Sequence, residues 1–173
     1  MQYITPYSPV WPDCFRELAR HLRPFILNRC AIHHVGSKSI PGMPAKDIID
    51  AIIECPIGSM PRIIKALAGA GYEHEGDLGV TSREAFRLLA GTSVAGSPTH
   101  HLYACESNSP EMMKMLAFRD YLRTHTDRAQ WLASKKIECD AAATSHDDYI
   151  KRKDPYYRII IREATAQATG NRH

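Results

Sequence analysis

The sequence predicts an α+β fold in which a mixed β-sheet is covered by helices on one side and followed by a helical C-terminal third. Two observations predict it. In the first two thirds, apolar residues alternate between helical spacing and short strand-like runs, and beyond residue 110 every expected element is a helix. The 173 residues, 44% of them hydrophobic, are enough for one core, so we expect a single domain over residues 1–173.

The chain should begin with one helix and two strands. Apolar residues at three- and four-residue spacing indicate an amphipathic helix over residues 13–28, in which Pro24 predicts a kink or an earlier end. Residues 31–35 are typical of a short strand. Residues 36–44 hold two glycines and two prolines and should form a loop. The isoleucine-rich residues 48–55 predict a buried central strand.

A second helix should run from Pro61 to about Ala70, where glycines end it. Strands are then expected over residues 72–75, 83–89 and 100–105, with a turn and a loop between them.

The remainder should be three helices. The first begins at Pro110, and the second covers residues 127–143. The third either follows the turn at residues 145–148 or begins after Pro155, because proline disfavours the interior of a helix.

Charge and hydropathy exclude several classes of protein. A net charge of +3 is too small to indicate a nucleic-acid-binding protein. The basic tract at residues 151–153 fits a solvated helix end, with a phosphate-binding patch as the minority interpretation. No run approaches the ~18 apolar residues of a membrane span, and the N-terminus lacks the pattern of a signal peptide. We therefore expect a cytoplasmic protein that does not enter a membrane.

The five cysteines are odd in number, widely spaced and without a C-x-x-C pair. This pattern argues against a disulfide framework and against a zinc site. We expect reduced and mostly buried thiols.

The candidate chemistry lies in residues 33–50, which read HHVGSKSIPGMPAKDIID. A strand ends in Gly36 and Ser37, where a glycine lets a phosphate approach the backbone and a serine can donate to it. Lys46 can neutralise phosphate charge. Asp50 on the next strand can hold a divalent cation, because Mg²⁺ binds through one or two carboxylates plus substrate phosphates. These are the parts of a phosphoryl or nucleotidyl transfer site.

Asp50 stands in an isoleucine-rich run, where a carboxylate without a partner is costly, and this favours a functional role. Asp47 is better explained as a loop residue. We expect Ser37, Asp50 and His101 to converge in one cleft, because the strands that begin near residues 31, 48 and 100 should be neighbours in one sheet.

The same segment resembles the GrpB family, bacterial proteins placed in the nucleotidyltransferase superfamily. The family's strongest motif is similar to E-H-V-G-S-T-[SA]-V-P-G-L-x-A-K-P-I-I-D, and the resemblance covers nearly the whole chain. Further blocks match at residues 83–87, 99–103 and 116–123. The resemblance implies a nucleotidyltransferase-like fold with Asp50 as the catalytic carboxylate. It places Gly36 and Ser37 on the phosphate side and favours Arg83 and Arg119 as phosphate ligands.

The sequence departs from the wider superfamily at one important position. Active members carry two carboxylates as D-x-[DE], but Ile52 stands at the second place after Asp50. His101 could stand in as a metal ligand, since imidazole binds divalent transition metals. Without the resemblance, His100 and His101 are explained equally well as one exposed and one packed histidine.

Three functional hypotheses stay open. The first is a metal-dependent nucleotidyltransferase that uses a divalent cation, Mg²⁺ before others, at Asp50. The second is a non-catalytic protein that kept the fold and binds a nucleotide or another phosphorylated small molecule. The third is an interaction protein whose helical C-terminal third binds a partner. Family members fused to dephospho-CoA kinase imply a link to nucleotide or coenzyme metabolism, and all three hypotheses are compatible with oligomerisation.

Overall fold

The first half of the chain forms the elements that the apolar pattern predicts. In the computed structural model, which describes residues 3–92 and 99–170, α1 (Trp11–Leu22) is followed by β1 (Ala31–Val35), the short 3₁₀ helix η1 (Ser37–Ser39) and β2 (Ile49–Cys55). Helix α1 ends two residues before Pro24, so the earlier of its two expected ends is correct. Each strand begins and ends within one residue of its predicted bounds.

The middle of the chain completes the sheet. Helix α2 (Met60–Gly69) leads into β3 (Tyr72–Gly76), β4 (Glu84–Leu88) and β5 (His100–Glu106). Most of the loop expected between β4 and β5 lies outside the described residues. The last third consists of helices α3 (Pro110–Thr124), α4 (Thr126–Ala142) and α5 (His146–Gly170). Helix α5 begins within the predicted turn, at His146, and runs through Pro155, so the later of its two expected starts is wrong and the earlier one is about three residues late.

The five strands form one mixed sheet in the order β1-β2-β5-β4-β3. Strands β2 and β5 run parallel at its centre, and the other neighbours are antiparallel. In the β2–β5 register Asp50 lies opposite His101, and Ile52 lies opposite Tyr103. Because side chains alternate along a strand, these four residues share one face of the sheet.

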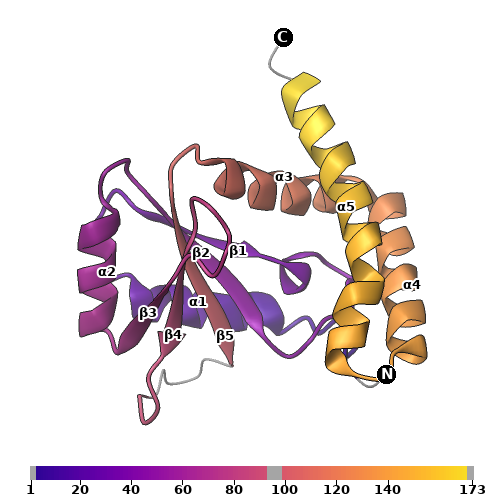
Figure 1. Ribbon diagram of the computed structural model, residues 1–173, viewed down its shortest axis with the longest axis horizontal. Coiled ribbons are helices and arrows are strands. Elements are labelled where there is room, and N and C mark those ends of the chain that lie inside the picture. Colours follow the sequence, from indigo (N-terminus) through magenta and orange to yellow (C-terminus); the bar gives the residue numbers. More distant parts are fainter. Residues whose placement is uncertain (1–2, 93–98, 171–173) are drawn as a thin grey trace.

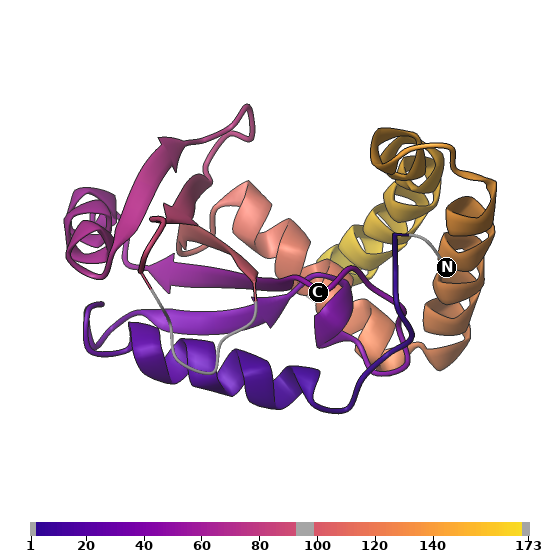
Figure 2. The same ribbon diagram turned by 90° about the horizontal axis from the view of Figure 1, so that it is seen from below.

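Helices cover both faces of the sheet, so the expectation of helices on one side is wrong. Helices α1 and α2 pack on one face against Ala51 and Ile53 (Figures 1 and 2). On the other face Met112 of α3 packs against Ile52 and Cys105. The physical reason is that β2 is apolar on both sides: Ile52 and Ile53 point to opposite faces and both are fully buried.

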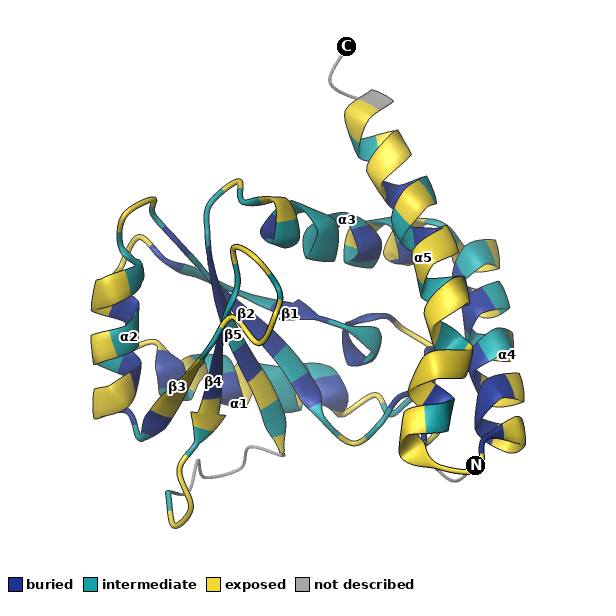
Figure 3. Ribbon diagram, in the orientation of Figure 1, coloured by how far each residue is buried: buried dark blue, intermediate teal, exposed yellow. Residues whose placement is uncertain are grey.

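Helices α4 and α5 lie beside the sheet (Figures 1 and 2), and together with α3 they form a second apolar cluster. Phe118, Leu132 and Ile160 come from α3, α4 and α5 and pack on Ile40 and Met43 of the loop after η1. Figure 3 shows that the outer sides of α2 and α5 are largely exposed, as is the loop between β3 and β4. This second cluster holds the C-terminal helices next to the residues that the sequence marks for chemistry.

All five cysteines are free thiols, and four of them are buried. No helix in the described ranges combines the length and apolar character that crossing a membrane requires.

Candidate functional site

A pocket of about 160 Å³ lies where the loop after β1 and the start of β2 meet helices α4 and α5. Four of the predicted site residues line it: Ser37, Lys46, Asp50 and His101. Asp50 and His101 face each other across the β2–β5 pair, with Oδ1 of the carboxylate 3.1 Å from Nδ1 of the imidazole. The structure therefore brings Ser37 and His101 to one pocket, although they lie 64 positions apart in the sequence.

Gly36 is not among the described lining residues, but it lies directly against Asp50, which is. Its φ of +70° and ψ of −171° belong to a region that essentially only glycine adopts. A Cβ atom at this position would lie 2.4 Å from Oδ2 of Asp50. The glycine thus allows the backbone to turn beneath the carboxylate, and this contact with Asp50 differs from the expected contact with a phosphate.

Ser37 is the centre of a hydrogen-bond network. Its Oγ lies 2.7 Å from the hydroxyl of Tyr157 on α5 and 2.7 Å from Nζ of Lys136 on α4. The Lys136 ammonium also donates to the carbonyl oxygen of Pro44. Lys136 is only 2% exposed, so these contacts fix the amine within the wall of the pocket.

Positive charge exceeds negative charge in the pocket. Lys46, Lys136 and Lys153 line it together with a single aspartate, Asp50. Burial first, and then the nearby Lys153 and Lys46, lower the pKa of Lys136 to about 7, while Asp50 opposes them. Burial also lowers the pKa of Lys153, again with help from Lys46. Three amines held this close together favour an anion between them.

Tyrosine rings on α5 support the lysines. The Lys153 ammonium lies 4.5 Å from the ring centre of Tyr157 and 5.5 Å from that of Tyr149. These are cation–π distances, which stabilise a charged amine in a partly buried position. Burial raises the pKa of Tyr157 to about 12, so its hydroxyl keeps its proton at neutral pH.

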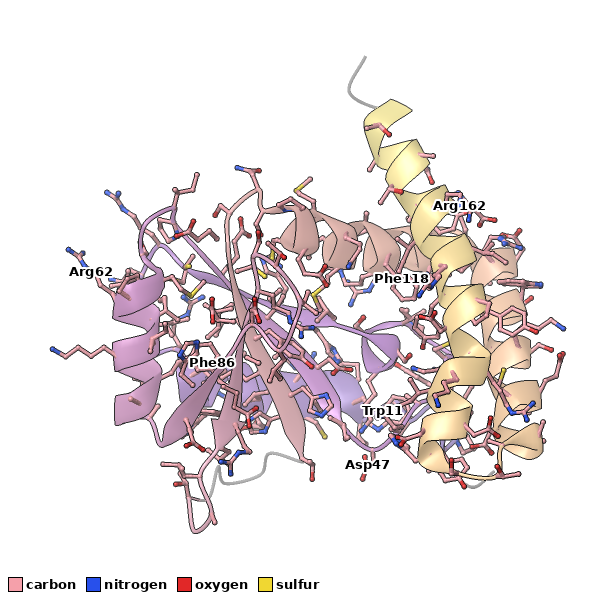
Figure 4. All side chains as sticks on the ribbon, viewed as in Figure 1. Trp11, Asp47, Arg62, Phe86, Phe118 and Arg162 are labelled. Atoms are coloured by element: carbon pink, nitrogen blue, oxygen red, sulfur yellow. The ribbon has the colours of Figure 1, made fainter. Side chains whose placement is uncertain are left out.

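Lys38 also borders the pocket, but its charge is already neutralised. Its ammonium lies 2.6 Å from Oδ1 of the exposed Asp47 and 4.6 Å from the ring centre of Trp11. Trp11 and Asp47 are labelled in Figure 4. Asp47 stands before the first residue of β2, which agrees with the expectation of a loop residue.

The two predicted arginine ligands do not contribute to the described lining of the pocket. The Arg83 guanidinium stacks over Tyr103, 4.3 Å from the ring centre, and in the described part of the chain its buried Nε has no hydrogen-bond partner. Arg119 pairs with Asp120 and donates to the carbonyl oxygen of His34. Both arginines therefore have local structural contacts.

Sequence analysis missed the residues that the C-terminal helices contribute, which are Lys136, Tyr149, Lys153 and Tyr157. Lys153 belongs to the basic tract that was interpreted as a solvated helix end. The neighbouring Lys151 and Arg152 are indeed exposed, whereas Lys153 points toward the pocket. One signal was available for Lys153: it stands four residues before Tyr157, a spacing that places both side chains on the same face of a helix.

The donor set for a metal ion is small. In the described residues no group of three His, Cys, Asp or Glu side chains could hold a metal. Ile52, at the position of the second carboxylate, is fully buried beneath α3. Glu54, next on the same face, pairs with His33 at 2.9 Å. Asp50 could therefore hold Mg²⁺ only together with water or with oxygens of a bound phosphate, and His101 adds a nitrogen ligand that suits a transition metal better than Mg²⁺.

The comparisons with known proteins agree with this architecture. The model of the family described as "GrpB protein" matches residues 3–163. The UPF0157 protein YqkA of Bacillus subtilis (strain 168) is 34% identical over 96% of this chain, and the chain spans about half of that relative, 48% of its length.

Solved structures show the same fold. The crystal structure of the conserved protein GrpB from Enterococcus faecalis aligns with a TM-score of 0.78 at 30% identity, covering 95% of this chain and 98% of that one. The Cid1 poly(U) polymerase with MgGTP bound aligns with a TM-score of 0.53 at 14% identity. That alignment covers 78% of this chain and 42% of the polymerase. The fold is thus nucleotidyltransferase-like.

Proposed function

The chain belongs to the GrpB family, and from this premise we propose that it binds a nucleotide or another phosphorylated small molecule in the pocket beside Asp50. One observation carries the proposal: Lys46, Lys136 and Lys153 converge on a pocket that contains a single carboxylate. Amines that lower one another's pKa gain stability when an anion neutralises them. A phosphate group supplies that negative charge together with several acceptor oxygens.

The size of the pocket favours the phosphate part of such a ligand. Its 160 Å³ is below the roughly 300–1,000 Å³ of pockets that enclose a whole drug-sized molecule. We infer that phosphate groups enter between Lys46 and Lys153, while the rest of the ligand stays near the half-exposed His101 at the rim.

A second candidate function is nucleotidyl transfer with a divalent metal. It is favoured by the contact between Asp50 and His101 and by the likeness in fold to a polymerase that was crystallised with MgGTP. Asp50 would hold Mg²⁺ together with the phosphates of the ligand, and His101 would contribute where the metal is a divalent transition metal. Such a metal would neutralise charge that develops on the phosphate oxygens.

The non-catalytic alternative rests on Ile52. A carboxylate at this position would face Val35, Cys105 and Met112, an environment that disfavours charge. Among the described residues that line the pocket, Asp50 is then the only acid. A protein with that lining can bind a phosphate ligand without transferring it.

Calorimetric titration with MgATP, MgCTP and MgGTP tests the proposal. We expect at least one of them to bind the wild-type protein and Asp50→Asn to weaken that binding, while Asp47→Asn changes it little. Lys153→Met should weaken binding about tenfold or more, because a charge-assisted contact to phosphate is lost. The matched control is Lys151→Met, which removes an exposed lysine from the same helix.

Absence of binding to all three complexes, or an equal loss in the Lys151 and Lys153 variants, contradicts the proposal. Release of pyrophosphate with a bound nucleotide favours transfer, whereas binding without release favours the non-catalytic protein.

A further inference from the structure

We propose that Ser37 is a nucleophile that forms a covalent phosphoester with its ligand, and that Lys136 is the general base that activates it. The inference rests on the proposed function for its ligand class, a phosphate ester or anhydride, and on the contacts of Ser37 for its chemistry. It assigns a covalent step to the side chains that line the lysine-rich wall of the pocket.

The contacts of Ser37 match the arrangement of an activated nucleophile. Such a group needs a base within hydrogen-bond reach and a further group that orients the pair. Lys136 Nζ lies 2.7 Å from Ser37 Oγ, and the carbonyl oxygen of Pro44 holds the amine in place. The Tyr157 hydroxyl, 2.7 Å from the same Oγ, is able to donate to it.

The backbone presents Ser37 to the pocket. Strand β1 ends at Val35, Gly36 turns with a positive φ, and Ser37 is the first residue of η1. A sharp turn from a strand into a helix places a side chain at the surface of a site instead of within the sheet, the arrangement by which other enzymes expose a nucleophilic serine. Ser39, two residues later, is buried and donates to the Gly36 carbonyl oxygen, so the two serines have different environments.

Lys136 can act as a base because its amine loses its proton easily. The charged and titratable groups around it are Lys46 from the loop, Asp50 from β2, and Lys153 and Tyr157 from α5. The two lysines and burial disfavour the ammonium form, and Asp50 alone favours it. A neutral amine can donate to Pro44 and accept the Ser37 proton in the same geometry.

The covalent step balances without an added reagent. The Ser37 hydroxyl gives its proton to the neutral Lys136 amine, and Oγ forms a bond to phosphorus. The bond between phosphorus and the leaving oxygen breaks, and that oxygen departs with the electron pair. Lys46 and Lys153 neutralise charge on the phosphoryl oxygens. Attack by water, or by the hydroxyl of an acceptor, then forms a new bond to phosphorus and breaks the bond to Ser37 Oγ. Oγ takes back the proton held by Lys136, and the proton of the attacking oxygen passes through solvent to the leaving group that departed in the first step.

The test uses a fluorophosphonate, a phosphorus electrophile that labels activated serines with loss of fluoride, on the whole chain. We expect one adduct per molecule, located at Ser37 by mass spectrometry of peptides. Labelling should be absent in Ser37→Ala and unchanged in Ser39→Ala. Its rate should fall about 100-fold in Lys136→Met, within the range that a general base contributes, and remain unchanged in Lys135→Met.

A second variant covers the case in which Lys136→Met fails to fold. Lys136→Arg keeps the charge and the donors but cannot accept a proton, so it too should lose labelling. A wild-type rate that rises with pH and levels off above about 7 agrees with Lys136 as the base. No adduct at Ser37, or equal rates in the wild type and in both folded Lys136 variants, overturns the proposal.

The outcome separates the two proposals. A protein that binds a metal–nucleotide complex by calorimetry but resists the fluorophosphonate keeps the proposed function and loses the serine nucleophile. A protein that is labelled at Ser37 but binds none of the three complexes loses the proposed function and keeps an activated serine.

Discussion

The position of Asp50 depends on the residue that lies beneath it. Gly36 has a backbone conformation essentially restricted to glycine, and an added Cβ atom would lie 2.4 Å from the Asp50 carboxylate. We expect Gly36→Ala to lower the free energy of unfolding by about 1–3 kcal/mol from backbone strain and to displace Asp50 as well. Urea denaturation measures the first effect, and calorimetry with a metal–nucleotide complex measures the second.

Gly42→Ala is the matched control for Gly36→Ala. Gly42 also has a positive φ, +78°, but nothing lies within 4 Å of the Cβ position. The control should therefore lose stability through strain while ligand binding stays unchanged. Equal loss of binding in both variants would show that the contact between Gly36 and Asp50 is unimportant.

Lys136 should make the stability of the protein depend on pH. Its pKa is lowered to about 7 by burial and by nearby lysines, so between that pH and its ordinary pKa the unfolded chain binds more protons than the folded one. Stability from this group therefore rises with pH. The expected gain is about 2 kcal/mol between pH 7 and about pH 9.

Lys136→Met provides the reference for this measurement. Buried thiols and phenols such as Cys105 and Tyr157 have raised pKa values and act in the opposite direction at higher pH. The difference between wild type and variant isolates the lysine. Urea denaturation at several pH values should give a slope in the wild type that the variant lacks, and equal slopes would contradict the lowered pKa.

The site residues that lie close together in the sequence could be predicted, whereas those from distant helices could not. Ser37, Lys46 and Asp50 lie within one loop and its flanking strand, where residue types and spacing suggest phosphate chemistry. Lys136 and Lys153 come from helices about 90 to 110 residues later. No local pattern distinguishes Lys136 from a solvated lysine, and the only signal for Lys153 is its place in the basic tract, one turn before Tyr157. The predicted arginines failed to reach the pocket lining because nearby groups, Tyr103 for Arg83 and Asp120 for Arg119, hold them elsewhere.

The positions of the strands could be predicted from their apolar patterns, whereas the prediction of the helix ends depended on how proline is treated. Pro24 ended α1 early, as the loss of an N–H donor predicts. Pro155 did not end α5, because Tyr149 and Ile160 are buried on either side of it and hold the helix together. Tertiary packing of this kind cannot be read from a single sequence.

A polar contact around Glu163 joins the C-terminal helices, and its contribution to stability can be tested. Glu163 of α5 accepts two hydrogen bonds from Arg128 of α4, at 2.9 and 2.7 Å, and one from the Tyr121 hydroxyl of α3 at 3.0 Å. A double-mutant cycle with Arg128→Ala and Glu163→Ala should give a coupling energy of about 1 kcal/mol, because the pair that joins α4 and α5 is bidentate and the Tyr121 hydroxyl of α3 helps to hold Glu163 in place.

The exposed pair of Arg158 and Asp154 is the control for that cycle. It lies four residues apart on one helix and should couple by only about 0.3–0.5 kcal/mol. Chemical denaturation of the single and double variants gives both values. A coupling no larger than that of the control pair would contradict a role of Glu163 in holding α3, α4 and α5 together.

For the molecule as a whole, the N-terminal segment links the C-terminal helices to the loop that carries Ala45 and Lys46. The backbone N–H groups of Tyr3 and Ile4 donate to Asp140 of α4, at 2.7 and 3.1 Å. Thr5 then forms a two-way backbone bridge with Ala45, the residue before Lys46. Asp140 is thereby connected to a lysine of the pocket through a short, hydrogen-bonded stretch of backbone.

This connection predicts that Asp140 affects both stability and ligand binding. Asp140 is 1% exposed, and Asp140→Ala leaves two N–H donors without their acceptor, which should lower the free energy of unfolding by about 2–3 kcal/mol. Affinity for a metal–nucleotide complex should fall as well, because the segment that supports Lys46 is released.

Asp140→Asn keeps an acceptor oxygen and should have a smaller effect on both quantities. Asp154→Ala, which removes an exposed acid from α5, should change neither. The contrary outcome is that Asp140→Ala destabilises the protein and leaves the affinity of the folded protein unchanged. That result would show that the N-terminal segment stabilises the packing of the helices but is not needed to position Lys46.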